Sequence, residues 1–209
     1  MQKKIRAIEG DNWSRRTEQF FKEWEENWPK SDPLAIDIIA QGNLISANTN
    51  LLEIGCGSGY RLKKFKETYN CSVQGIDCSE LAVKKARNNG VNAECRDIME
   101  WENENKYDVV IMGFFLYMCE DSELWEIGAK IDRMLSVKGT LLIYDFNTQE
   151  AKTTKYKHIQ GEKIFKRNYK NMFTWNPMYR LIREESYCEY PHKETKAPKD
   201  VRITTLRKG

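Results

Sequence analysis

The 209-residue sequence has no apolar run long enough to span a bilayer. No apolar segment typical of a signal peptide follows the first residues, Met1 to Arg6. Histidine is scarce, since only His158 and His192 occur, and the six cysteines form no C-x-x-C pair. Structural zinc sites need closely spaced Cys and His ligands, so we predict no metal. We expect a cytoplasmic protein with reduced cysteines and no membrane segment.

The net charge of +3 conceals an uneven distribution. Residues 151–209 carry 15 Lys and Arg against six Asp and Glu, whereas residues 1–150 carry 19 against 25. A basic segment can recruit an anionic partner, either nucleic acid or a small molecule with a phosphate or carboxylate. A solvated lysine-rich surface explains the same composition equally well, and the sequence leaves both interpretations open.

One stretch stands out: residues 51–59 read Leu-Leu-Glu-Ile-Gly-Cys-Gly-Ser-Gly. The apolar part predicts a buried parallel strand, and the alternate glycines predict a tight turn into a helix starting near Tyr60. Because glycine has no Cβ, the backbone here can approach a ligand closely and adopt positive φ. Dinucleotide enzymes need G-x-G-x-x-G, whereas this spacing is G-x-G-x-G. An ordinary strand-to-helix turn is the alternative.

Strand and helix patterns then alternate along the chain. Strands are predicted at 50–54, 72–76, 91–95, 107–112 and 139–145, and helices at about 59–69, 79–89 and 122–136. Such alternation indicates a parallel sheet with helices on both faces, whose ligands lie at the carboxyl ends of the strands. Gly55, Asp77, Asp97 and Gly113 all fall at such ends. An acid at the end of the second strand can accept hydrogen bonds from both hydroxyls of a ribose.

The glycine string, Asp77, the run Arg96-Asp97-Ile98 and the strand that ends at Gly113 follow one another in a familiar order. Over roughly residues 50–145 the chain resembles the class I methyltransferases that use S-adenosylmethionine (SAM). The resemblance implies an α/β fold: a three-layer αβα, Rossmann-like, seven-stranded, mostly parallel sheet with an antiparallel last strand and N-terminal helices as a lid. It implies SAM as cofactor, S-adenosylhomocysteine as product and methyl transfer as activity.

The same resemblance assigns residues to the cofactor. Glu53 would hydrogen-bond within the turn or reach the amino acid part of SAM through water, Asp77 would hold the ribose, and Asp97 would meet the adenine. A helix cap is the alternative role for Asp77 and for Asp97. The implied cofactor-binding set is Glu53, Gly55, Cys56, Gly57, Gly59, Asp77, Cys78, Asp97, Ile98, Met112 and Gly113.

We interpret the chain as a single domain with a helical lid over 1–48, a SAM-binding core over 49–145, and an acceptor loop and final β-hairpin over 146–209. Aromatic residues at helical spacing predict a helix over 13–28, capped by Ser14 and ended by Pro29. Its aromatic face would either close over SAM or pack against the sheet. A second helix should run from Pro33 to about Ile45, with Asp32 as its cap. Residues 178–190 and 201–206 predict the last two strands.

The sequence indicates less clearly which residues bind and activate the methyl acceptor. His158 is the natural general base by residue type, although an exposed loop histidine is an equally good interpretation. Tyr117 and Tyr144 are the other polar groups expected to face the methyl group, which completes the candidate catalytic set. The segment 113–117 lacks the Asn/Asp-Pro-Pro-Tyr motif typical of methylation of base or glutamine amino groups. A magnesium set of the catechol type is also incomplete, because Asp145 and Asn147 have no third member.

We therefore expect O- or N-methylation of a small-molecule acceptor, with anionic metabolites and surface sugars as candidates. Residues 165–169, the Asn176-Pro177 step and the final strands are similar to small methylases of nonulosonic (pseudaminic-type) sugar pathways. Two alternatives stay open. One is an RNA or protein methyltransferase that docks through the basic C-terminal region, and the other is a regulator that holds SAM without turnover. The expected state is a monomer or homodimer.

Overall fold

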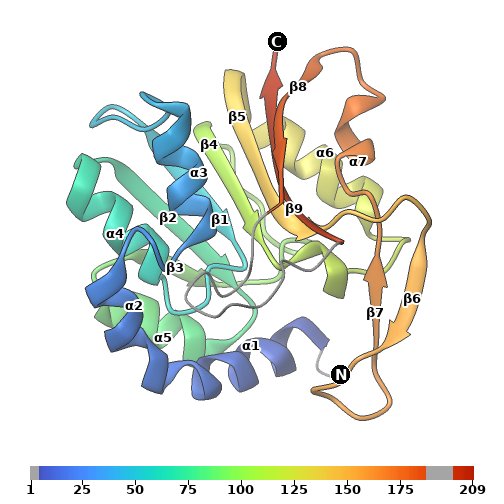
Figure 1. The fold of residues 1–209 in the computed structure, drawn as a ribbon, viewed down its shortest axis with the longest axis horizontal. Coiled ribbons are helices and arrows are strands. Elements are labelled where there is room, and N and C mark those ends of the chain that lie inside the picture. Colours follow the sequence, from blue (N-terminus) through green and yellow to red (C-terminus); the bar gives the residue numbers. More distant parts are fainter. Residues whose placement is uncertain (1–4, 187–199) are drawn as a thin grey trace.

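The computed structural model describes residues 5–186 and 200–209. Its centre is a seven-stranded sheet in the order β3-β2-β1-β4-β5-β9-β8 (Figure 1). The last strand, β9, runs antiparallel to β5 and β8, whereas β1 to β5 pair in parallel, which confirms the predicted sheet. The strands are β1 (Asn50–Ile54), β2 (Ser72–Asp77), β3 (Asn92–Cys95), β4 (Tyr107–Gly113), β5 (Leu135–Phe146), β8 (Tyr179–Glu185) and β9 (Val201–Lys208).

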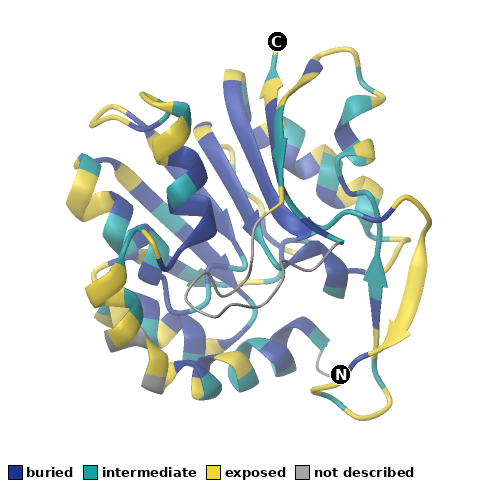
Figure 2. Cartoon of the chain, viewed as in Figure 1, coloured by how far each residue is buried: buried dark blue, intermediate teal, exposed yellow. Residues whose placement is uncertain are grey.

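Helices cover both faces of this sheet. One face packs α3 (Pro33–Gln41), α4 (Tyr60–Tyr69) and α5 (Glu80–Asn88), and the other packs the 3-10 turn η2 (Leu116–Met118), α6 (Leu124–Met134) and α7 (Asn171–Thr174). Successive strand residues alternate between the two cores: Leu51 and Ile111 face the first, Leu52 and Met112 the second. Figure 2 shows that the central strands are mostly buried, and because both of their faces are covered, most of their residues are apolar. The three-layer αβα architecture is therefore confirmed.

The N-terminal region differs from the prediction of one helix over 13–28. Helix α1 (Ile5–Arg16) starts earlier, and a 3-10 turn η1 (Glu18–Phe20) separates it from α2 (Phe21–Asn27). The break occurs where both the amide and the Oγ1 of Thr17 donate to the carbonyl of Trp13, each at 2.9 Å. Ser14 was predicted as an N-cap, which is wrong, because it lies buried in the last turn of α1.

Helix α3 begins as predicted. The Asp32 carboxylate accepts from the amide of Leu34 at 3.1 Å, and Pro33 occupies the first helical position. The helix ends at Gln41, before the predicted Ile45, because Gly42 has a φ of +60°.

A small hairpin was not predicted: β6 (Lys152–Lys155) pairs antiparallel with β7 (Lys163–Lys166). In Figure 1 the carboxyl ends of the parallel strands face the space between α1 and this hairpin. The second half of the predicted strand 178–190, the loop after it, and His192 and Cys188 lie outside the described residues. Across the described part of the chain, no helix combines the length and the apolar character that a membrane span requires.

Candidate active site

A cavity of about 670 Å³ lies at the carboxyl ends of the parallel strands. Its walls come from α1, the glycine turn, the segment after β4 and the β6–β7 hairpin. Eight of the expected cofactor residues line it: Glu53, Gly55, Cys56, Gly57, Asp77, Cys78, Ile98 and Gly113. Three others, Gly59, Asp97 and Met112, do not line it, whereas all three candidate catalytic residues do.

The glycine turn has left-handed backbone at three positions, with φ of +75° at Gly55, +54° at Gly57 and +67° at Gly59. A Cβ at Gly55 would lie 3.0 Å from the ring of Phe115, whereas a Cβ at Gly57 would find only the indole of Trp13, at 4.0 Å. The turn therefore leaves an open surface at Gly57, beneath an aromatic side chain of α1. A flat or bulky ligand can approach the backbone there.

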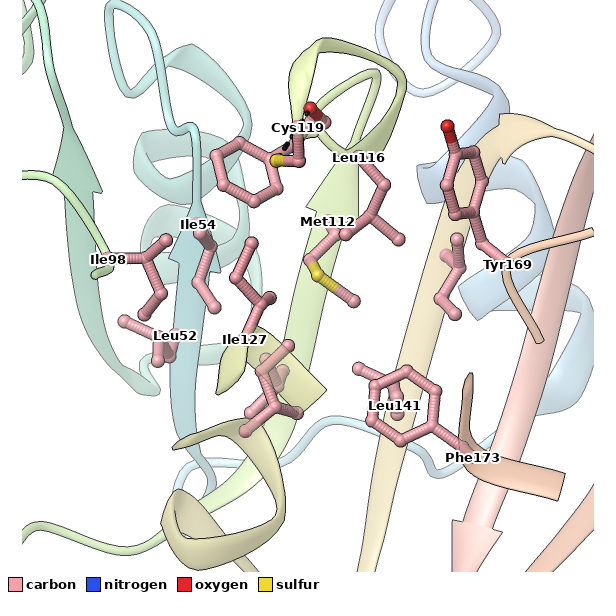
Figure 3. Close-up of a cluster of buried hydrophobic side chains, with 14 of the residues drawn as sticks. Leu52, Ile54, Ile98, Met112, Leu116, Cys119, Ile127, Leu141, Tyr169 and Phe173 are labelled. Atoms are coloured by element: carbon pink, nitrogen blue, oxygen red, sulfur yellow. Dashed lines mark hydrogen bonds between the residues drawn. The ribbon is translucent and has the colours of Figure 1, made fainter. Parts of the chain in front are cut away.

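Two of the expected cofactor residues have a packing environment instead. A Cβ at Gly59 would lie 2.9 Å from Ala86 Cβ, so this glycine permits close packing of the turn on α5. Met112 is fully buried, and Figure 3 shows its side chain inside the apolar cluster with Ile54 and Ile98.

Asp77, at the end of β2, has both carboxylate oxygens turned toward backbone amides. Its Oδ2 accepts from the amide of Gly57 and its Oδ1 from that of Ser79, each at 2.9 Å. Ser79 itself caps α5 by accepting from the amide of Ala82. Burial raises the pKa of Asp77 to about 6, against the lowering effect of the two amides. On the cavity side, α1 approaches so closely that a Cβ at Gly10 would lie 3.0 Å from Asp77 Oδ1.

Glu53 belongs to a buried ionic group that the sequence did not reveal. Its carboxylate pairs with Arg61, whose Nε also donates to Asp32 at 2.7 Å. Burial raises the pKa of Glu53 to about 7, although the nearby Arg61 charge lowers it. Within the described residues, Glu53 Oε2 has no hydrogen-bond partner. The position of Arg61, in the first turn of the helix that follows the glycines, was the signal that could have identified it.

Asp97 anchors α1. Its carboxylate binds Arg6 Nη2 at 2.9 and 3.0 Å, and Arg6 also binds Glu123 at 2.6 Å. Asp97 Oδ1 additionally accepts from the amide of Met99 at 2.9 Å, which is the local capping role considered from the sequence. Arg6 lines the cavity and was missed, because nothing in its sequence neighbourhood marks it.

The segment after β4 builds an aromatic chamber at the other end of the cavity. Phe114 has a φ of +49°, which is rare for a bulky residue and costs on the order of 1–3 kcal/mol. Its ring lies 4.7 Å from that of Tyr144 and 6.1 Å from that of Tyr117, which in turn lies 5.7 Å from Phe146. Such strain often marks a functional position.

Asp145 fixes this segment in place. Its Oδ2 accepts from the amides of Phe115, Leu116 and Tyr117 at 3.1, 2.9 and 3.3 Å. Burial raises the pKa of Asp145 to about 7 despite these hydrogen bonds. In the described ranges, no three Asp, Glu, His or Cys side chains are grouped in a way that could hold a metal ion.

The candidate catalytic residues occupy different parts of the chamber. The hydroxyl of Tyr117 lies 3.3 Å from that of Tyr156, and burial raises the pKa of Tyr117 well above its usual value. Tyr144 is buried beside Phe114. His158 is exposed at the rim, where its ring packs against Tyr156 at 5.3 Å.

Charge is segregated along the cavity. At the glycine-turn end the acids Asp32, Glu53 and Asp77 outnumber the basic Arg61, which pairs with the first two, whereas Lys155, Lys157 and Lys166 line the hairpin end. These lysines form no ion pair with any acid in the described part of the chain; Lys166 Nζ instead lies 4.3 Å from the centre of the Phe146 ring. One end of the cavity thus suits a cation and the other an anion.

Comparisons with known proteins agree with this geometry. Residues 51–139 match the family model described as a methyltransferase domain. The malonyl-[acyl-carrier protein] O-methyltransferase of Bacillus cereus is 28% identical over 106 residues, and its counterpart in Priestia megaterium is 35% identical over 74 residues. These alignments cover 48% and 33% of this chain but only 39% and 27% of the relatives. The chain therefore matches well under half the length of these curated relatives.

A solved structure resembles the chain along almost its whole length. It is the 1,6-didemethyltoxoflavin-N1-methyltransferase of Burkholderia thailandensis, with bound 1,6-didemethyltoxoflavin and S-adenosylhomocysteine. The TM-score is 0.69 at 16% identity, covering 97% of this chain and 88% of that one. The likeness establishes a shared fold. Together with the match over residues 51–139, it identifies a methyltransferase domain built on the Rossmann-like fold of the SAM-dependent methyltransferases.

Proposed function

We propose that the chain transfers a methyl group from SAM to a small anionic acceptor. The observation that carries this proposal is the charge segregation of the cavity. SAM is a sulfonium cation, and its expected binding end holds three buried acids, Asp32, Glu53 and Asp77. Arg61 pairs with the first two, so an excess of negative charge remains there and favours a cation. The opposite end holds the hairpin lysines Lys155, Lys157 and Lys166, which have no acidic partner among residues 5–186 and 200–209 and favour an anion.

The residues of the glycine-turn end fit SAM. Asp77 offers its remaining lone pairs to the two ribose hydroxyls, and Gly57 leaves room for the methionine part beneath Trp13. Ile98 is buried in the wall and supplies an apolar surface for the adenine. SAM supplies the reactive methyl group, so the protein has to bind it, align the acceptor and accommodate the acceptor's proton.

The names of the curated relatives suggest one acceptor to test. Malonyl-[acyl-carrier protein] presents a free carboxylate, which is an anionic acceptor for O-methylation. The lysine-lined end of the cavity is compatible with such a carboxylate. Nucleic acid is a poorer fit, because the lysines that line the cavity surround an aromatic chamber and not an extended groove.

Calorimetry with SAM, S-adenosylhomocysteine and NAD, followed by incubation of the protein with methyl-labelled SAM and an acceptor panel, tests the proposal. We expect micromolar binding of both sulfur ligands, no binding of NAD, and label transfer to an anionic small molecule. Binding of NAD in place of SAM would contradict the function. Transfer to RNA, with an affinity that falls steeply with salt, would favour the nucleic-acid alternative. SAM binding without transfer to any metabolite of the host would favour the regulator.

A further inference from the structure

The side chain of Glu9, on α1, has an unsatisfied oxygen in the wall of the aromatic chamber. Glu9 is only 4% exposed and lines the cavity. One of its carboxylate oxygens, Oε1, pairs with Arg16, whereas Oε2 has no hydrogen-bond partner among the residues that the structure describes. A buried carboxylate oxygen without a donor is costly, so a ligand with an O–H or N–H group would complement it.

Glu9 faces the chamber and not the sheet. Burial is the largest cause of the raised pKa of Tyr156, and the nearby Glu9 carboxylate adds to it both as a hydrogen-bonding group and as a charge. The pKa of Tyr117 is raised by burial, then by Tyr156, and to a smaller extent by the charge of Glu9. The hydroxyls of these two tyrosines lie 3.3 Å apart, so Glu9 sits beside a pair of polar groups in an otherwise aromatic wall. The next residue, Gly10, lies so near the carboxylate that we expect to bind the ribose that an added Cβ would be 3.0 Å from it, so Glu9 is adjacent to the cofactor end of the cavity.

The opposite side of the chamber carries positive charge above a flat surface. Lys166 Nζ lies over the Phe146 ring, and Phe146 packs edge-on against Tyr117 and Phe114. Aromatic walls of this kind favour a planar ring, which can stack or pack edge-to-face. Lys166 has no acidic partner in the described residues, so its ammonium group can bind an anion.

We propose, on the basis of the methyltransferase function above, that the acceptor is a ring-bearing anion with an O–H or N–H group. The ring lies in the aromatic chamber, the anionic group binds Lys166, and the O–H or N–H donates to Glu9 Oε2. The oxygen or nitrogen of that group attacks the methyl carbon of SAM as the carbon–sulfur bond breaks. The sulfonium becomes the neutral thioether of S-adenosylhomocysteine, and the acceptor's proton passes to Glu9, which later releases it to water. Glu9 thus takes the role that sequence analysis gave to His158.

Calorimetry on the protein saturated with S-adenosylhomocysteine tests this with three probes. The probe 4-hydroxybenzoate has the ring, the hydroxyl and the anion, benzoate lacks the hydroxyl, and 4-hydroxybenzamide lacks the anion. We expect 4-hydroxybenzoate to bind at least tenfold more tightly than either of the others. Equal affinities, or no binding of 4-hydroxybenzoate at millimolar concentration, would overturn the proposal.

Two variants identify the groups responsible. In Glu9→Gln, Arg16 retains the amide oxygen and the NH₂ group faces the chamber, so the preference for 4-hydroxybenzoate over benzoate should vanish. Lys166→Met should remove the preference over 4-hydroxybenzamide. Lys163→Met is the matched control, since Lys163 lies on the same hairpin but not in the cavity wall, and it should preserve both preferences. Unchanged preferences in Glu9→Gln would refute the role of Glu9.

Affinity for S-adenosylhomocysteine separates this proposal from the one on which it rests. All variants should bind that ligand as the unaltered protein does, which also shows that they fold. If the unaltered protein does not bind S-adenosylhomocysteine, the proposed methyltransferase function is itself contradicted. Binding with no selectivity among the probes, or methyl transfer only to a malonyl thioester, would leave that function standing and reject the ring-bearing acceptor.

Discussion

Replacing Asp77 with Asn should weaken binding of S-adenosylhomocysteine and remove the part of its pH dependence that is centred near pH 6. In the folded protein two amides already bind the Asp77 carboxylate, one on each oxygen, and the ribose hydroxyls would donate to the remaining lone pairs. Hydrogen bonds to a charged group contribute about 1.5–3 kcal/mol each. An Asn side chain retains one carbonyl oxygen and turns an NH₂ toward the other donors. The expected loss is therefore about 2–3 kcal/mol, or roughly 30- to 150-fold in affinity.

The sign of the pH effect follows from the raised pKa. Asp77 titrates at about 6, and only its ionised form accepts from both hydroxyls. Affinity should thus rise with pH up to about 6 and level off above it, with proton release on binding below that value. Calorimetry between pH 5 and 8, in two buffers of different ionisation enthalpy, measures both. Asp108→Asn is the control, since Asp108 also accepts from a backbone amide, that of Asn50, but lies outside the cavity wall. An Asp77→Asn affinity within threefold of the original would refute the ribose assignment.

Three further predictions concern stability and the position of α1. Gly59→Ala should lower the free energy of unfolding by about 2–4 kcal/mol in urea titrations, and Gly90→Ala by only about 1 kcal/mol. Both glycines have positive φ, but only at Gly59 would the added Cβ lie 2.9 Å from an atom of α5. Burial raises the folded-state pKa of Asp145 to about 7, above its unfolded value, so the free energy of unfolding should fall as pH rises from 4 to 7. In Asp145→Asn that fall should be smaller by up to about 4 kcal/mol, and an equal fall in both proteins would contradict this. Gly10→Ala places a Cβ 2.7 Å from the Cβ of Ser79, the N-cap of α5, and should speed dissociation of S-adenosylhomocysteine at least tenfold in stopped-flow chase experiments. Gly128→Ala, with its nearest neighbour at 3.7 Å, should leave that rate unchanged.

The central sheet was predictable because its strands are buried on both faces. An apolar run bounded by turn residues then marks each strand, and β1 was predicted at its observed bounds, Asn50–Ile54. The start of β5 was missed: it begins at Leu135, within the predicted helix 122–136, because Leu135 fits the apolar period of that helix as well. Short apolar runs do not distinguish the two states by period alone.

Helix α1 was missed because its inward face is polar. Arg6, Glu9 and Ser14 are buried, so the hydrophobic period that identifies amphipathic helices is absent. The aromatic residues from Trp13 onward gave a strong period instead, and this shifted the predicted helix beyond the true one. Hairpin β6–β7 was missed for a related reason, since all four residues of β6 are exposed and show no apolar alternation.

The two ends of the candidate site also differ in how far the sequence predicts them. The cofactor end is built from strand ends and glycines, whose identity and spacing are visible in the sequence, and eight of its eleven expected residues line the cavity. The acceptor end depends on residues distant in sequence: Glu9 from α1, Phe114 from the end of β4 and Lys166 from the hairpin. Only the tertiary fold brings these together, so no local pattern could reveal them.

The position of α1 couples the two ends of the cavity. Gly10 lies beside Asp77, and Glu9 lies in the wall of the aromatic chamber, so consecutive residues of one helix border the cofactor end and the acceptor end. Because a helix rises only 1.5 Å per residue and moves as a rigid rod, a displacement that clears the Asp77 carboxylate also withdraws Glu9 from the chamber. The ion pairs of Arg6 with Asp97 and Glu123 hold the start of the same helix in place. The acceptor end therefore depends on the same position of α1 that borders the cofactor end, and we predict that SAM binds before the acceptor.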